Sequence, residues 1–417
     1  MSRYLYTAVI VASVFATDII DSLDAREPPE SFRPKLSTVV ELDLTTGISR
    51  TISEHKENTL TLLDQRDGVL LGVEFDGKEK PQMFGLSPTT GKVLWAFGTD
   101  SETWEHFFDY RFNEPEGFSI PHHDFAKPPT GGRTPFCGLA GDTLAGIDVH
   151  TGRVLWRITP PGHASNDFAW QSVFQLRDQV VAVIHGRVMI VSRTDGQIML
   201  ELKRAPTASY YKVDQPVETD DYILMAFDNG KDKELIRWNK QSAKVDERYN
   251  SGRTVVKVMA ATKGLVITHE QGSFVGRNIQ RLDQVIWRKK REAWFDPGAR
   301  AVVWGQYLVT RSEDMPTTDL RDGSEFSLFH QPKGRVVRFS NYPWAIQDET
   351  LYTVSPSGIQ CWNKNRLESR GSPTLEKPIW TPSTESTDSK REPAFIDCLM
   401  GSGKIYLVLV HDWNPVF

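Results

Sequence analysis

The stretch DVHTGRVLW, residues 148–156, decides the fold because it recurs along the chain. A second strong copy is TTGKVLW, residues 89–95, and weaker copies centre on Gly196, Asp283 and Gly334. In the strong copies a glycine follows a turn dipeptide and precedes an apolar run. Glycine adopts positive φ without steric cost, and the run after it suits a strand. Each copy therefore predicts a hairpin between two strands.

The spacing of these turns predicts the architecture. The mean step is about 48 residues, which lies in the range of four-stranded propeller blades. The turns fall at Gly47, Gly91, Gly152, Gly196, Ala243, Asp283 and Gly334, and an eighth follows Trp362. Two further apolar runs lie between successive turns, and no long stretch has helical periodicity. We therefore expect an all-β, eight-bladed β-propeller of four-stranded antiparallel blades, with seven blades as the alternative.

The repeated phrase resembles the repeat of the PQQ-like, or quinoprotein alcohol dehydrogenase-like, β-propeller family. In that family the tryptophan at the end of the outer strand packs between neighbouring blades. The resemblance thus implies structural roles for the repeat positions Gly91, Trp95, Gly152, Trp156, Gly196, Trp287 and Gly334. It informs the fold far more than the chemistry, because one fold can support unrelated functions.

The chain has 417 residues, which exceeds the usual size of one globular core, but a propeller grows by repetition. We expect an N-terminal segment over residues 1–35 and a single propeller over residues 36–417. Strands within residues 394–411 are expected to close the first blade, which would leave no open sheet edge at the closure. The formal net charge of −5 provides no general attraction to nucleic acid.

The N-terminus bears on the location of the protein. Residues 4–16 carry no charge and are too short to span a membrane, so they are either a signal peptide or one more strand. Three cysteines at irregular spacing predict no disulfide framework, and Asn-x-Ser/Thr acceptors are absent from the sequence. A cytoplasmic location is favoured, with export as the alternative. No integral membrane segment is expected, and the oligomeric state is not indicated.

Motifs for catalysis are largely missing from the sequence. No two cysteines are adjacent, as they are beside the cofactor in quinone-dependent dehydrogenases, and neither His-Glu-x-x-His nor Gly-x-Ser-x-Gly occurs. Gly401-Ser402-Gly403-Lys404 is interpreted as a hairpin turn and not a phosphate-binding loop. The sequence thus favours a non-catalytic module that binds or scaffolds protein partners and holds no cofactor. The alternative is an enzyme or sensor that binds a small ligand in the central channel.

One insertion, residues 98–135, departs from the repeat. It has a net charge of −4 and is rich in aromatic residues, which suits a basic, partly apolar protein partner. The candidate binding residues are Trp104, Glu105, Tyr110, Glu114, Glu116, Phe118, His122, His123 and Asp124. Alternatively, residues 104–108 form an inner strand of the third blade and the rest is a surface cap. A metal site is not expected, because the adjacent His122 and His123 point to opposite sides of an extended segment.

Overall fold

The computed structural model describes residues 36–97, 135–160, 172–203, 212–290, 301–327, 342–363 and 394–411, with gaps of one to six residues inside these ranges. The described residues form strands and turns, and no helix occurs among them. In chain order the strands are β1 (Leu36–Asp43), β2 (Ser49–Lys56), β3 (Thr59–Arg66), β4 (Val69–Phe75), β5 (Gln82–Leu86), β6 (Val93–Phe97), β7 (Phe136–Ala140), β8 (Thr143–Ile147), β9 (Val154–Ile158), β10 (Ser172–Gln175), β11 (Gln179–Ile184), β12 (Arg187–Ser192), β13 (Ile198–Lys203), β14 (Lys212–Val213), β15 (Val217–Glu218), β16 (Tyr222–Asp228), β17 (Lys233–Asn239), β18 (Lys244–Gly252), β19 (Val256–Ala261), β20 (Leu265–Glu270), β21 (Ser273–Asn278), β22 (Arg281–Lys290), β23 (Ala301–Trp304), β24 (Tyr307–Thr310), β25 (Pro316–Asp319), β26 (Glu325–Ser327), β27 (Tyr342–Gln347), β28 (Thr350–Ser355), β29 (Gly358–Asn363), β30 (Ala394–Gly401) and β31 (Lys404–His411).

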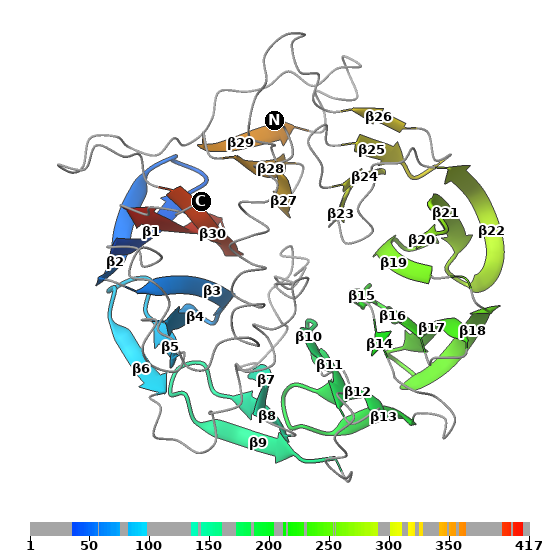
Figure 1. Ribbon diagram of the computed structural model, residues 1–417, viewed down its shortest axis with the longest axis horizontal. Coiled ribbons are helices and arrows are strands. Elements are labelled where there is room, and N and C mark those ends of the chain that lie inside the picture. Colours follow the sequence, from blue (N-terminus) through cyan, green and yellow to red (C-terminus); the bar gives the residue numbers. More distant parts are fainter. Residues whose placement is uncertain are drawn as a thin grey trace, which may run out of the picture.

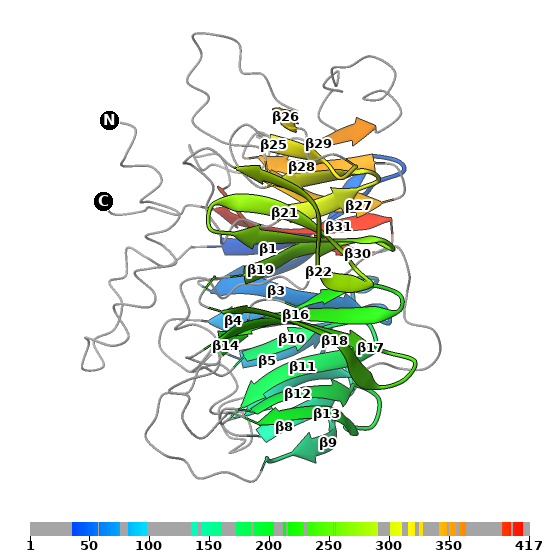
Figure 2. The ribbon, with the colours of Figure 1, turned by 90° about the vertical axis from the view of Figure 1, so that its right-hand side faces the viewer.

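The described strands group into eight antiparallel sheets of three to five strands. Sheet 1 holds β30, β31, β1 and β2, and the remaining strands follow in chain order as sheets 2 (β3–β6), 3 (β7–β9), 4 (β10–β13), 5 (β14–β18), 6 (β19–β22), 7 (β23–β26) and 8 (β27–β29). The sheets form a ring, with the first described strand of sheets 2, 4 and 6 near the axis and the last on the outside (Figure 1). The strands run across the thickness of the ring (Figure 2). This arrangement confirms the all-β propeller expected from the sequence.

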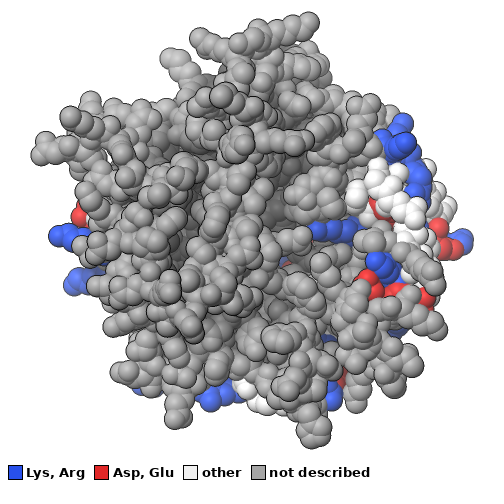
Figure 3. Space-filling model, in the orientation of Figure 1, with Lys and Arg blue, Asp and Glu red and all other residues white. Residues whose placement is uncertain are grey.

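The hydrophobic core lies between neighbouring sheets. One cluster joins Val181 and Ile190 of sheet 4 to Ile223 and Trp238 of sheet 5. Because both faces of a sheet are packed, strands such as β11 read as continuous apolar runs rather than alternating ones. The described charged atoms visible in the space-filling view lie mainly at the rim of the ring (Figure 3).

Sheet 1 contains strands from both ends of the described chain. β1 pairs with β31 from Leu36 opposite His411 to Asp43 opposite Lys404. The ammonium of Lys404 also lies 2.9 Å from the carboxylate of Glu41 in β1. Backbone and side-chain bonds thus join residues 36–43 to residues 404–411, and β1 lies inside the sheet rather than at its edge.

The repeat turns have the geometry that glycine allows. Gly91 and Gly152 have φ of 69° and 70°, and each amide donates 2.8 Å to the carbonyl four residues earlier. The turn placed at Asp283 was wrong, because Asp283 lies inside β22 and the hairpin turn lies between Asn278 and Arg281. A second register shift in the β21–β22 pair, between Arg277 opposite Val285 and Asn278 opposite Arg281, adds three residues between this turn and Trp287, so counting back from the tryptophan misplaces the turn. Gly334 lies outside the described residues.

Candidate functional site

The insertion predicted to bind a partner joins β6 to β7. All nine of its candidate residues, from Trp104 to Asp124, lie outside the described residues, and so does the His122-His123-Asp124 stretch. The described chain ends at Phe97 in β6 and resumes at Pro135, directly before β7. The structure therefore describes the residues that flank the insertion, here called its frame. They are β6 up to Phe97 on one side and Pro135 with β7 on the other.

The strand before the insertion is fixed by Trp95. This side chain lies two residues before Phe97, and its indole Nε1 donates a 2.7 Å hydrogen bond to the carbonyl of Val149. Val149 lies in the turn between β8 and β9, so the bond joins sheet 2 to sheet 3. The insertion therefore leaves from a strand that is anchored to the neighbouring sheet.

The return end of the insertion is fixed by Arg193, which is fully buried beyond β12 of sheet 4. Its Nε and Nη2 donate to the carbonyl of Pro135 at 3.1 and 2.7 Å, and its Nη1 donates to the carbonyl of Leu176 at 2.6 Å. Burial lowers the pKa of Arg193 to about 10, so the guanidinium stays charged at neutral pH. Hydrogen bonds from a charged donor are stronger than neutral ones, which makes this a firm anchor.

A second contact fixes the same end. Gln175 of β10 donates from Nε2 to the carbonyl of Cys137, and its Oε1 accepts from the Cys137 amide at 3.2 Å. The Cys137 thiol is buried, and burial raises its pKa, which keeps it protonated and unreactive at neutral pH. Cys137 is therefore part of the frame and is not a nucleophile in this state.

Three tryptophans tie neighbouring sheets by the same geometry. Each indole lies over a glycine that faces it across the same sheet, and each Nε1 donates to a carbonyl in the next sheet. The pairs are Trp95 over Gly85, Trp156 over Gly146 and Trp287 over Gly276, and the acceptors are Val149, Arg193 and Leu320 at 2.7, 2.8 and 3.0 Å. A Cβ at Gly146 would lie 2.3 Å from the Trp156 ring, so a larger residue cannot fit without moving the indole. The repeat positions thus act at the seams between sheets.

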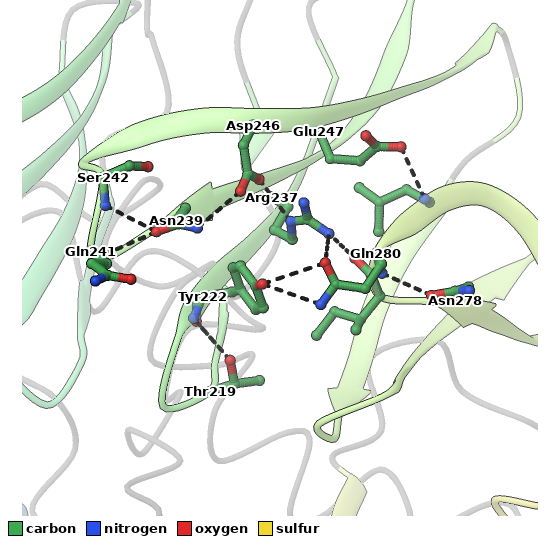
Figure 4. Close-up of polar contacts among 12 residues, drawn as sticks. Thr219, Tyr222, Arg237, Asn239, Gln241, Ser242, Asp246, Glu247, Asn278 and Gln280 are labelled. Atoms are coloured by element: carbon green, nitrogen blue, oxygen red, sulfur yellow. Dashed lines mark hydrogen bonds and ion pairs between the residues drawn. The ribbon is translucent and has the colours of Figure 1, made fainter.

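In sheets 1 and 5, an arginine instead of a tryptophan donates the hydrogen bond to the next sheet. Arg50 of sheet 1 donates from Nη2 to the carbonyl of Pro88 at 2.9 Å. Arg237 of sheet 5 donates from Nη1 to the carbonyl of Ile279 and from Nε to Asp246 at 2.7 Å. Its guanidinium also lies 4.7 Å from the centre of the Tyr222 ring (Figure 4). As with the tryptophans, the acceptor lies in the turn that precedes the outermost strand of the next sheet, between β5 and β6 for Pro88 and between β21 and β22 for Ile279.

Buried charges in the described chain serve the same structural role. Glu270 forms a bidentate pair with Arg277 at 2.7 and 2.9 Å, and both side chains are at most 2% exposed. The Arg277 guanidinium lies 4.1 Å from the ring of Tyr249 in sheet 5. Burial raises the pKa of Glu270, but its bonds to Arg277, Thr268 and Arg288 outweigh burial and lower the pKa below 4.5. A carboxylate engaged in this way is a poor general base.

Side chains that could hold a metal ion are dispersed in the part of the chain that the structure describes. Among the described residues, no three His, Cys, Asp or Glu side chains are grouped to hold a metal ion. Cys137 in β7 and Cys361 in β29 form no disulfide with the described residues. Within the same residues, no helix has the length and hydrophobicity needed to cross a bilayer.

The outermost strands carry exposed apolar side chains. Most lie beside register shifts, where a bulge places consecutive residues on the same side of the strand. They are Val93, Leu94, Leu155, Ile198, Val285 and Ile286, each 42–52% exposed, and Ile48, in the turn directly before β2, is 69% exposed. Apolar residues on a free strand edge are typical of surfaces that bind other chains.

More than half of this chain matches the model of a known protein family. The model of the family described as outer membrane protein assembly factor BamB matches residues 35–212 and, in an overlapping match, residues 82–280. Together these matches span residues 35–280, more than half of the 417 residues. The chain belongs to this BamB family. Membership confirms the PQQ-like β-propeller that the repeated phrase predicted.

Three solved structures are similar to this BamB-family chain at low sequence identity. The computationally designed Ika8 protein is 13% identical, with coverage of 85% of this chain and 96% of that chain and a TM-score of 0.50. BamB from Moraxella catarrhalis is also 13% identical, with coverage of 75% and 88% and a TM-score of 0.48. The C-terminal WD40 domain of Sif2 is 10% identical, with coverage of 84% and 94% and a TM-score of 0.45. Of the three, only Ika8 reaches a TM-score of 0.5, and this likeness concerns the fold alone. No curated protein matches the chain.

Some structural positions were missed in the sequence. Gly85 and Gly146 each stand ten residues before a repeat tryptophan, and this constant spacing is a signal that could have identified them. Arg50 and Arg237 left no such signal, because they occupy different strands, β2 and β17, and share only the acceptor position. Arg193 lies in a polar turn sequence that does not indicate burial.

Proposed function

We propose that this protein is a non-catalytic, eight-bladed β-propeller that binds and scaffolds protein partners. Each of the eight sheets would be one blade, and residues 36–417 would form one domain. The family description, an assembly factor, supports a role in protein binding. The observation that carries the proposal is the frame, in which Trp95 and Arg193 anchor both ends of an acidic, aromatic insertion.

The chemistry of the insertion favours a basic partner. Glu114, Glu116 and Asp124 would attract positive charge, and rings such as Trp104 and Tyr110 would bury against apolar side chains. Rigid anchors at both ends reduce the conformational entropy that is lost when the loop binds. The anchored frame thus suits a binding loop, and it requires no catalytic group.

The family description also bears on location. A protein related to outer-membrane assembly factors favours the exported alternative over the cytoplasmic location expected from the sequence. In this proposal residues 1–16 act as a signal peptide. Fractionation of cells that produce the full chain, with mass determination of the mature N-terminus, would test the location.

The binding role is tested by deleting residues 115–130. The shortened protein should keep its melting temperature, because the anchors lie outside the deletion, and it should lose a protein that the full chain captures. The triple variant Glu114→Gln, Glu116→Gln, Asp124→Asn should associate more slowly, and the difference should shrink at high salt, where exposed charges are screened. If the deletion unfolds the protein, or if capture persists, the insertion is a structural cap.

A further inference from the structure

β22 differs from the other described outer strands in length and charge. It has ten residues, more than any other described strand, and it pairs only with β21 in the described chain. It carries Arg281, Arg288, Lys289 and Lys290 against a single acidic residue, Asp283, for a net charge of +3. The strand therefore has one unpaired edge with an unusual basic character.

The bulge in this strand exposes two apolar residues together. Gly276 faces Trp287 and Arg277 faces Val285, so Ile286 is the extra residue. Trp287 points inward and is tied to sheet 7, whereas Val285 and Ile286 are 42% and 51% exposed. An apolar pair is thus held on the outer rim by a fixed strand.

The positively charged side chains that follow Val285 and Ile286 in β22 are exposed to solvent. Arg288 lies 3.2 Å from the buried Glu270 carboxylate, which neutralises part of its charge. Lys289 and Lys290 are exposed and form no ion pair or hydrogen bond with the described residues. In Figure 3, Lys and Arg atoms lie next to uncharged atoms at the right-hand edge, where Figure 1 places β22.

We propose that the free edge of β22 binds an extended, acidic and apolar segment of a partner protein, which extends sheet 6 by one strand. Backbone hydrogen bonds along an unpaired edge provide affinity in this mode, and side chains provide specificity. In antiparallel pairing, acidic residues of the segment would precede its apolar residues, opposite Lys290 and Lys289 and then Ile286 and Val285. A second copy of β22 is disfavoured as occupant, because two strands of charge +3 repel each other. This site is independent of the insertion between sheets 2 and 3.

The test uses the full chain and a fluorescent peptide, Glu-Asp-Thr-Thr-Val-Ile-Thr, in an anisotropy titration. The account predicts saturable binding that weakens at least about tenfold in the variant Lys289→Glu, Lys290→Glu, because both complementary charges are reversed. The matched control is Arg153→Glu, Arg157→Glu, which reverses two exposed charges at the β9 edge and should bind as the unaltered protein does. A peptide with proline in place of valine and isoleucine should not bind, because it cannot pair along the edge.

Three results would overturn this proposal. They are absence of saturable binding to the unaltered protein, equal weakening in the control variant, and unchanged binding after reversal of Lys289 and Lys290. Circular dichroism and melting curves establish that each variant is folded before its titration. Because the deletion of residues 115–130 leaves β22 intact, failure of this site and failure of the insertion would be observed separately.

Discussion

Trp156 and Arg193 link sheets 3 and 4 by hydrogen bonds donated from each sheet to the other. The indole Nε1 of Trp156 in sheet 3 donates a 2.8 Å hydrogen bond to the backbone oxygen of Arg193 in sheet 4. The side chain of Arg193 returns to sheet 3 and donates two hydrogen bonds to the carbonyl of Pro135. Pro135, at the C-terminal end of the insertion, is therefore one of the hydrogen-bond acceptors that join the two sheets. The stability of this contact between sheets is thus linked to the position of the proposed binding loop.

Arg193→Met should destabilise the protein by about 3 kcal/mol or more. The change removes three hydrogen bonds from a charged donor and leaves two buried carbonyls without it, while side-chain length is kept. The stability of Arg193→Lys should fall between those of the unaltered protein and the methionine variant, because one ammonium cannot reproduce the planar guanidinium geometry. Urea titration measures the free energy of unfolding of each variant. A loss below about 0.5 kcal/mol in the methionine variant would show that the hydrogen bonds of Arg193 are dispensable.

Gly146→Ala should cost about 1–3 kcal/mol, because the new methyl group would overlap the Trp156 ring and force it to move. Gly264→Ala is the matched control, since a Cβ there meets no atom within 4 Å. The control should change the free energy of unfolding little. Equal losses in the two variants, measured in the same titration, would contradict the packing of tryptophan on glycine.

Acid should weaken the protein partly through Glu270. Its pKa is lowered in the folded state, so the unfolded chain binds the proton more readily, and the stabilisation is complete above about pH 4.5 and is lost as the pH falls through the lowered folded pKa. Glu270→Gln should cost about 3–5 kcal/mol at neutral pH, because Arg277 and Arg288 lose their carboxylate partner. Between about pH 6 and pH 3 the variant should lose less stability than the unaltered protein. Parallel losses over this range would refute the role of this carboxylate.

Pyrroloquinoline quinone should not bind, because the sequence lacks the vicinal cysteines that accompany this cofactor in the dehydrogenases it resembles. Calorimetric titration of the quinone with calcium should give only the heat of dilution. A saturable signal in the micromolar range would instead favour the alternative of a ligand in the central channel.

The sequence predicts the repeats better than the contacts between them. The strong copies around Trp95 and Trp156 carry the turn, the glycine and the outer strand in one continuous phrase, so local chemistry suffices to place them. The turn before Trp287 was misplaced at Asp283, because a second register shift adds three residues to β22 and leaves no mark in residue type. Arg193 and Pro135 are 58 residues apart, and no local pattern links a charged residue in a turn to a distant carbonyl. The candidate loop residues remain predictions, since they lie outside the described residues.

Site-specific photo-crosslinking in cells that contain the native partners tests the central claim most directly. With the photoreactive residue at position 110 in place of Tyr110, the account predicts a crosslink to one defined protein, and the triple amide change at Glu114, Glu116 and Asp124 should weaken it. The same residue placed at exposed Lys244 in β18 of sheet 5, outside the sheets that flank the insertion, is the control and should not give this crosslink. No crosslink at position 110 above the level at position 244, in a protein shown to be folded, would contradict the assignment of this propeller as a protein-binding scaffold that acts through its insertion.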